Sequence, residues 1–202
     1  MEKKEYDLCW LRFAMIGDRD VREQWIRMGE RIAFPGRAPL METAKLELKQ
    51  GLFALTGQTP AWTESPDEAG LIVGRRQDDE AIDNAFRAQE WDGLDEEGFM
   101  IRPLERNGRR VLVLAGKTDR GVLYGAFRLL MNIAARMRPD VMDLVENPRN
   151  GVRMINHWDN MDGSIERGYA GPSFFYRDHQ FSWQEERIRD YARLLASTSI
   201  NA

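Results

Sequence analysis

Two stretches of the chain carry apolar residues at the spacing of an α-helix. In residues 41–56 one helical face is apolar, and Gly57 and Pro60 follow directly, so the pattern predicts a helix that ends near Thr56. In residues 119–137 the apolar stripe is wide, which indicates a helix buried on most sides. The apolar positions are Ala44, Leu48, Leu52 and Leu55 in the first stretch, and Val122, Ala126, Leu129, Ile133 and Met137 in the second.

Short apolar runs predict β-strands. Residues 8–13 form one such run, and residues 70–74, which are bounded by glycines, form another. Two more are predicted over residues 98–102 and 110–115, and Asn107-Gly108 lies between them. Because this dipeptide accepts the positive φ angles of a tight turn, we expect an antiparallel hairpin. Residues 78–91 are acidic and weakly periodic, which favours a loop with some helix.

Prolines interrupt the chain after the second helix. Pro139 and then Asn147-Pro148-Arg149-Asn150 disfavour both helix and strand. We therefore place a domain boundary here and predict two domains, 1–148 and 149–202.

The second predicted domain is one β-loop-α unit. The pattern gives a strand over residues 153–157, a long glycine-rich loop, and a helix that begins at Ser182, where Ser182 and Glu185 match a capping box. Residues 199–202 lie where another strand would begin. The fold class is α/β, with an N-terminal domain whose mixed or antiparallel sheet is covered by helices.

Composition narrows the classes of function. Of the 202 residues, 43% are hydrophobic and 31% are charged, as in globular domains. The 29 basic residues are scattered among 33 acidic ones, so we expect no nucleic-acid partner. The single Cys9 cannot form an internal disulfide. The charged start and the lack of any stretch of ~20 apolar residues predict a cytoplasmic protein without membrane contact.

Three short patterns in the sequence resemble parts of phosphate- or metal-binding sites. Gly116-Lys117-Thr118 lacks the earlier glycine of a phosphate-binding loop, since Val111 stands there, so a tight turn with Thr118 or Asp119 as helix N-cap is favoured. Residues 158–169 do not form a calcium loop, because the first and twelfth positions are Trp158 and Tyr169. The only two histidines, His157 and His179, make a weak metal site. We expect no cofactor and no metal.

The most informative segment spans residues 154–171, where a predicted strand runs into aromatic, polar and glycine residues. In α/β barrels such loops build the active site. A Trp face can stack on a pyranose while Asn, Asp, His and Arg supply directional hydrogen bonds. Structural interpretations stay open for each residue: Trp158 as core, Asn160 and Asp162 as turn formers, Glu166 with Arg167 as a solvated pair.

Residues 155–171 read INHWDNMDGSIERGYAG, and this run closely resembles the α-glucuronidases of glycoside hydrolase family sixty-seven, which remove 4-O-methylglucuronic acid from xylan fragments. Residues 9–12, 116–125 and 189–197 resemble the same family, with the sequences CWLR, GKTDRGVLYG and RDYARLLAS. The resemblance implies an N-terminal α/β domain, a central (β/α)8 barrel and a C-terminal helical region. Because a barrel needs roughly 250 residues, we expect an N-terminal fragment that ends within the first βα unit of the barrel.

The resemblance also implies an inverting hydrolysis of the α-1,2 link between 4-O-methylglucuronic acid and xylose. Its catalytic acid and base would come from later barrel strands, so we assign no catalytic residue here, and none of Asp159, Asp162 or Glu166 takes these roles. Trp158 would line the uronic acid pocket, with His157, Asp159 and Arg167 as polar neighbours. The binding partner would be a glucuronoxylan-derived oligosaccharide. The resemblance is also compatible with a homodimer of the full-length protein. The alternative is a non-catalytic carbohydrate-binding or interaction module.

Overall fold

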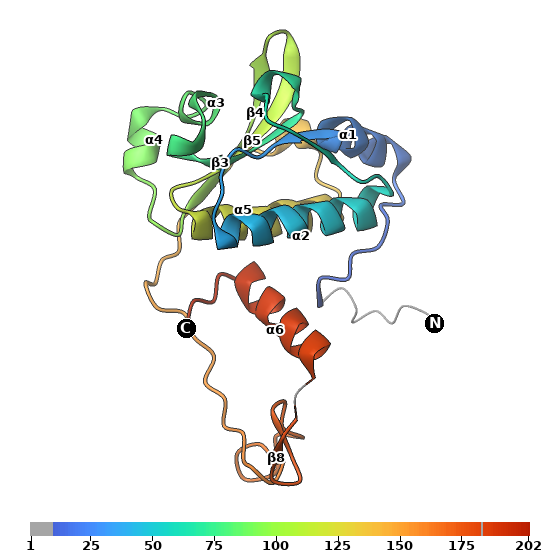
Figure 1. The fold of residues 1–202 in the computed structure, drawn as a ribbon, viewed down its shortest axis with the longest axis vertical. Helices are drawn as coiled ribbons and strands as arrows, with labels where there is room; N and C mark the ends of the chain where they lie inside the picture. Colours follow the sequence, from blue (N-terminus) through green and yellow to red (C-terminus); the bar gives the residue numbers. More distant parts are fainter. Residues whose placement is uncertain (1–9, 183) are drawn as a thin grey trace. The chain divides into compact units, whose positions relative to one another are not determined.

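The computed structural model describes residues 10–182 and 184–202. Its contacts divide the chain into two compact units, Met1–Arg149 and Asn150–Ala202 (Figure 1). Each unit is described by itself.

Six strands among the described residues of the first unit form one mixed sheet, in the order β2-β1-β3-β5-β4-β6. Four neighbouring strands, from β2 to β5 in that order, run parallel, and β4 runs antiparallel to both β5 and β6. The expected α/β class with a mixed sheet is therefore confirmed. The strands are β1 (Arg31–Ala33), β2 (Ala61–Thr63), β3 (Leu71–Arg75), β4 (Phe99–Arg106), β5 (Arg109–Gly116) and β6 (Leu144–Glu146).

Two long helices, α2 (Pro39–Thr56) and α5 (Asp119–Ala134), lie along one face of the sheet (Figure 1). They pack closely because Gly51 leaves room for Leu130, which a Cβ at that position would meet at 2.5 Å. Both predicted helices are confirmed. The second ends at Ala134, three residues before the predicted end, because the backbone of Arg136 turns to a φ of 63°.

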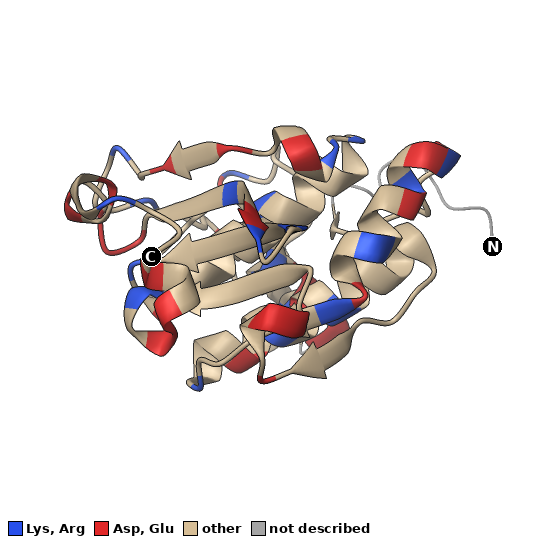
Figure 2. Ribbon diagram, turned by 90° about the horizontal axis from the view of Figure 1, so that it is seen from above, with Lys and Arg blue, Asp and Glu red and all other residues tan. Residues whose placement is uncertain are grey.

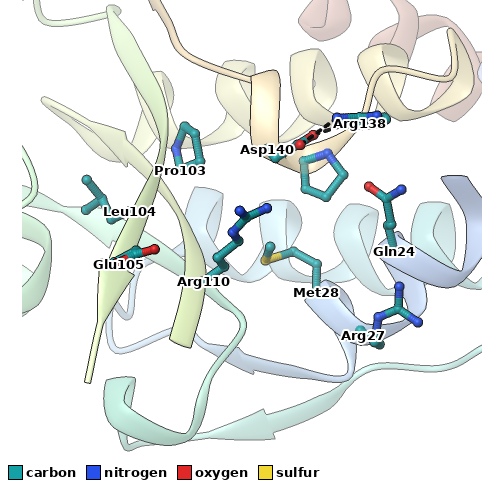
Figure 3. Close-up of a pocket in the computed structure, with 10 residues that line it drawn as sticks. Gln24, Arg27, Met28, Pro103, Leu104, Glu105, Arg110, Arg138 and Asp140 are labelled. Atoms are coloured by element: carbon teal, nitrogen blue, oxygen red, sulfur yellow. Dashed lines mark hydrogen bonds and ion pairs between the residues drawn. The ribbon is translucent and has the colours of Figure 1, made fainter. Parts of the chain in front are cut away.

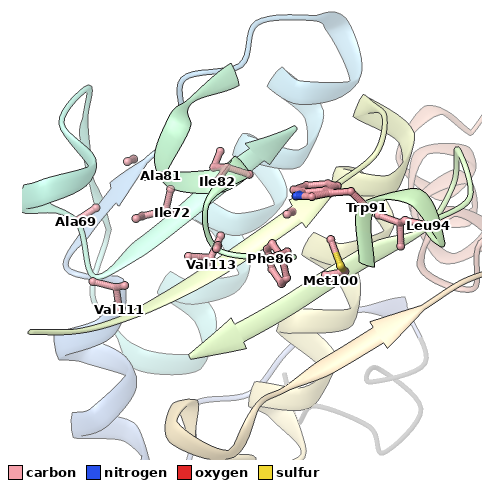
Figure 4. Close-up of a cluster of buried hydrophobic side chains, with 13 residues drawn as sticks. Ala69, Ile72, Ala81, Ile82, Phe86, Trp91, Leu94, Met100, Val111 and Val113 are labelled. Carbon is pink, nitrogen blue, oxygen red and sulfur yellow. The ribbon is translucent and has the colours of Figure 1, made fainter. Parts of the chain in front are cut away.

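The other face of the sheet is covered by short helical segments, chiefly α3 (Glu80–Asp83) and α4 (Ala88–Asp92). Strand side chains alternate between faces, so Ile72 and Val113 point to this side while their neighbours point toward α2 and α5. Figure 4 shows Trp91 and Phe86 packed over this face. The full cluster is Ala33, Ala69, Ile72, Ala81, Ile82, Ala85, Phe86, Trp91, Leu94, Met100, Val111, Val113 and Ala115.

The predicted hairpin is also confirmed. β4 and β5 pair along their whole length, and the turn residues Asn107 and Gly108 have φ angles of 50° and 70°. The first unit also contains α1 (Arg19–Gly29) and the 3-10 turns η2 (Pro66–Glu68), η3 (Arg76–Asp78) and η4 (Pro139–Val141).

The predicted strand over residues 8–13 is wrong in the part that the structure describes, while Leu8 and Cys9 lie outside the described residues. Residues 10–13 form a turn and an irregular segment, and Leu11 has a φ of 58°. Leu11 and Phe13 are nevertheless buried. In residues 10–13 the apolar pattern therefore reflects packing and not pairing in a sheet.

The second unit contains a small hairpin, β7 (Tyr176–Arg177) and β8 (Gln180–Phe181), and one helix, α6 (Glu185–Ser197). The helix begins later than predicted, and the capping box is wrong. Gln184 occupies the N-cap position without a side-chain cap, while the Ser182 amide donates to the carbonyl oxygen of Phe175. Ser182 thus belongs to the chain beside the hairpin.

The predicted strand over residues 153–157 is irregular in the structure. The amides of Asn201 and Ala202 both donate to the carbonyl oxygen of Arg153, at 2.9 and 3.1 Å. A parallel strand needs hydrogen bonds along its edges, and in the described part of this unit they are limited to Arg153.

Candidate functional site

The loop that follows residue 157 folds back on itself. Asp159 bridges to Ile165, and the Glu166 amide donates to the carbonyl oxygen of Trp158 at 2.8 Å. The carboxylate of Asp162 accepts from the amide and the hydroxyl of Ser164 at 2.8 and 2.7 Å. The turn-forming role considered for Asp162 is therefore confirmed.

The carboxylate of Asp159 fixes this loop from inside. Its Oδ2 accepts from the Phe174 amide at 2.9 Å and from the Ser173 hydroxyl, and only 6% of its side chain is exposed. Burial acts to raise the pKa of Asp159, but hydrogen bonds from Ser173 and from the backbone of Phe174 and Phe175 outweigh it and leave the pKa lowered. Asp159 therefore stays ionised and holds residues fourteen and fifteen positions later against the loop.

His157 connects the same loop to α6. Its Nε2 lies 2.7 Å from the hydroxyl of Tyr191, and its Nδ1 lies 3.5 Å from Oδ1 of Asp159. The imidazole also makes edge contacts with the rings of Phe175 and Tyr191. Burial, followed by the charge of Asp159, raises the pKa of Tyr191. Since both ring nitrogens face protein groups, His157 acts here as a support for the loop.

A pocket of about 500 Å³ opens beside Trp158. Trp158 and Tyr169 are 58% and 72% exposed. The core interpretation of Trp158 is therefore wrong. Tyr169 and Glu166, which both line the pocket, are hydrogen-bonded through their side chains, and this bond raises the pKa of the Tyr169 hydroxyl. The lining residues are Trp158, Asp159, Asn160, Glu166, Arg167 and Tyr169.

The pocket combines groups that suit an acidic sugar. Flat aromatic faces stack on C–H surfaces, a guanidinium pairs with a carboxylate, and amide and carboxylate oxygens accept from hydroxyl groups. Of the four predicted binding residues, Trp158 and Arg167 line the pocket with exposed side chains, and Asp159 lines it while mostly buried. His157 lies outside the lining. Sequence reasoning missed Tyr169, although it stands in the same motif.

The motif Gly116-Lys117-Thr118 is a turn, as favoured. Lys117 Nζ donates to the carbonyl oxygen of Leu94, and the Thr118 hydroxyl donates to that of Glu96, both at 2.6 Å. Both side chains therefore hold the loop before β4, which contains Leu94 and Glu96, by hydrogen bonds. Thr118 occupies the N-cap position of α5, but its side chain does not cap the helix.

A larger cavity, of about 750 Å³, lies in the first unit between α1, the β4–β5 hairpin and η4 (Figure 3). Basic and acidic residues are interspersed over the ribbon (Figure 2). Within the described ranges no three His, Cys, Asp or Glu side chains gather as a metal site would require. No helix there is long and apolar enough to cross a bilayer.

Comparisons with known proteins cover both units. Residues 9–129 match the description "Glycosyl hydrolase family 67 N-terminus", and residues 132–202 match "Glycosyl hydrolase family 67 middle domain". A probable α-glucuronidase A of Aspergillus fumigatus is 35% identical over 167 residues, which cover 82% of this chain and 19% of that protein. The Aspergillus niger protein of the same name is 34% identical over 195 residues, covering 96% of this chain and 22% of its own.

The chain thus spans about a fifth of the length of these relatives. Among solved structures, a family GH115 4-O-methyl-α-glucuronidase, BtGH115A, described as specific for decorated arabinogalactans, matches with a TM-score of 0.56 at 19% identity. The match covers 85% of this chain and 24% of that one, and it shows a shared fold.

Proposed function

The chain belongs to glycosyl hydrolase family 67, and on that premise we propose that its second unit supplies one wall of the sugar pocket of an α-glucuronidase. The substrate would be a glucuronoxylan oligosaccharide, cleaved with inversion at the α-1,2 link between 4-O-methylglucuronic acid and xylose. The relatives named α-glucuronidase support the reaction class.

One observation carries the proposal: Trp158 and Arg167 line the same pocket, in the part of the chain that matches the family's middle domain. Trp158 gives an apolar wall for the C–H face and methyl ether of the sugar, while Arg167 can pair with its carboxylate. Asp159 and His157 support this wall from behind through Ser173 and Tyr191.

The catalytic acid and base would come from other parts of the enzyme. Inversion requires a protonated carboxyl group and a carboxylate base about 6.5–9.5 Å apart, with a water between them. Asp159 and Asp162 both have lowered pKa values through hydrogen bonds within the loop, Asp159 despite its burial, and Glu166 is hydrogen-bonded to Tyr169. A general acid needs a raised pKa instead, which argues against a role for either aspartate as the acid.

The test is binding without turnover. We expect the purified chain to bind an aldouronic acid, xylotriose carrying 4-O-methylglucuronic acid, with NMR shift changes at residues 158–169 and no release of the uronic acid. Trp158→Ala should weaken this binding by ~1–3 kcal/mol because stacking and burial are lost. Phe181→Ala removes another exposed aromatic ring of the same unit that lies outside the pocket, and it should leave the affinity unchanged.

Two results would contradict the proposal. Release of 4-O-methylglucuronic acid by the purified chain would return the catalytic role to Asp159, Asp162 or Glu166. Equal affinity of the wild type and Trp158→Ala would remove Trp158 from the sugar site and favour the interaction-module alternative.

A further inference from the structure

The cavity of the first unit has the size of a small-molecule site. Its volume of about 750 Å³ falls within the ~300–1,000 Å³ range of ligand pockets. It is built by elements that are distant in sequence, since α1, the β4–β5 hairpin and η4 all contribute. The indole Nε1 of Trp25 donates to the carbonyl oxygen of Met137 at 2.8 Å, and this bond ties α1 to the segment before η4. The cavity walls are therefore anchored in the core.

Two cations at this cavity have no acidic side chain within hydrogen-bond or ion-pair distance in the described part of the chain, although the charge of Arg110, after the hydrogen bond from Arg138, contributes to lowering the pKa of Asp140. Within the described ranges, neither Arg110 nor Arg27 forms a hydrogen bond or an ion pair with another side chain. Asp140 is already bound by Arg138, with Oδ1 at 3.0 Å from Nε and Oδ2 at 2.6 Å from Nη2. Glu105 faces Arg110 across the hairpin register without forming an ion pair among the described residues.

Arg110 is an exposed residue whose side chain lines the cavity together with apolar neighbours. In Figure 3 Met28 lies beside Arg110 and Pro103 lies on the neighbouring strand. Pro139 also lines the cavity. The fork of N–H groups of a guanidinium fits a carboxylate in two bonds. Proline and methionine surfaces beside it suit a ring with C–H faces.

We propose that this cavity is a second, non-catalytic binding site for a uronic acid residue of an oligosaccharide, whose carboxylate binds Arg110. The choice of a sugar rests on the proposed function of the second unit, whereas the choice of a carboxylate rests on the cavity itself. The carboxylate of Glu105 can accept from sugar hydroxyl groups, and so can the Oε1 of Gln24, whose Nε2 donates to Asp20 at 2.9 Å. Such a site would keep an acidic polysaccharide fragment near the enzyme between cleavage events.

The experiment is an NMR titration of the full chain with D-glucuronate, D-glucose and inorganic phosphate. We expect saturable shifts at the amides of residues 24–28, 104–105 and 138–140 with glucuronate. Arg110→Gln should weaken this binding about tenfold or more, since a charge-assisted pair is lost. Arg109→Gln is the matched control, because Arg109 donates to the carbonyl oxygens of Asp67 and Glu68 outside the cavity, and it should bind as the wild type does.

Trp158→Ala separates the two sites. It should weaken the binding that causes shifts at residues 158–169 while leaving the shifts at the first-unit cavity unchanged, so either site can fail without the other. Equal glucuronate affinity in the wild type and Arg110→Gln would overturn the proposal. So would glucose binding as tightly as glucuronate, or phosphate binding as tightly, since the latter would reveal a general anion site.

Discussion

The two units use their apolar residues in opposite ways. In the first unit, large side chains such as Trp25 and Phe127 are buried. Among the described residues of the second unit, Ser197 alone is buried, and seven large apolar or aromatic side chains are exposed. They are Val152, Met154, Ile155, Trp158, Met161, Tyr169 and Phe181.

This difference in burial suits the first unit to stability and the second unit to recognition of a ligand. The first unit has a core whose burial stabilises it at about 25 cal/mol per Å² of apolar surface. The second unit keeps its shape through hydrogen bonds around Asp159 and ring contacts around His157. An exposed aromatic side chain held by such a network is available to a ligand, and a buried one is not.

The largest expected effect on the free energy of unfolding comes from replacing one tryptophan in each unit with alanine. Trp25→Ala should lower the free energy of unfolding by about 3–5 kcal/mol, because Trp25 is 1% exposed and a cavity would remain. Trp158→Ala should change it by less than about 0.5 kcal/mol, as at other exposed positions. Urea denaturation followed by circular dichroism measures both. Losses of similar size would show that Trp158 belongs to a core after all.

A second effect should stay local to the second unit. Asp159→Ala removes the acceptor of the Phe174 amide and leaves a mostly buried donor unpaired, which costs about 1–3 kcal/mol. Hydrogen exchange should show the Phe174 amide opening at least tenfold more often, with amides of β3 and β5 unchanged.

Asp162→Ala is the matched control, since it removes an exposed carboxylate of the same loop. It should leave the protection of Phe174 as in the wild type. Faster exchange throughout β3 and β5 in Asp159→Ala would mean that the two units unfold together and that the comparison fails.

Long elements of the fold could be predicted because burial on one face demands apolar residues at a fixed spacing. The helices α2 and α5 and the β4–β5 hairpin are of this kind. The three-residue strands β1, β2 and β6 carry too few positions for any period to show, and they were missed. Residues 10–13 show the converse error, since an apolar run can pack without pairing.

The candidate site was predicted only as far as one motif reaches. Trp158, Arg167 and Tyr169 stand within twelve residues of one another, and two of the three were identified. The partners of Asp159 and His157 are Ser173, Phe174 and Tyr191, which come from elements that only the fold brings together. A sequence with polar residues in a loop does not tell which of them face a ligand and which hold the loop.

The smallest effect concerns a charged contact of the first unit and how it depends on pH. Glu90 is 14% exposed, and hydrogen bonds from Arg102 and then from the backbone of Arg87 lower its pKa to about 2. A carboxyl group whose pKa is lower in the folded state adds stability above its unfolded pKa of ~4.3, and this stability is lost as the pH falls toward 2. Glu90→Gln should therefore cost about 1 kcal/mol at pH 7, after solvent screening of the pair, and almost nothing near pH 2.

Urea denaturation of Glu90→Gln and the wild type at several pH values measures this dependence, with Glu105→Gln as the control from the exposed end of β4. Because Glu90 bridges α4 to β4 through Arg102 at 2.8 Å, its titration should appear in the global unfolding of the first unit. Titration of Asp159 should instead appear only as local exchange in the second unit, since its bonds stay within one loop and the residues after it. A difference in unfolding free energy between Glu90→Gln and the wild type that does not change with pH would show that the charge of Glu90 does not contribute to the stability of the first unit.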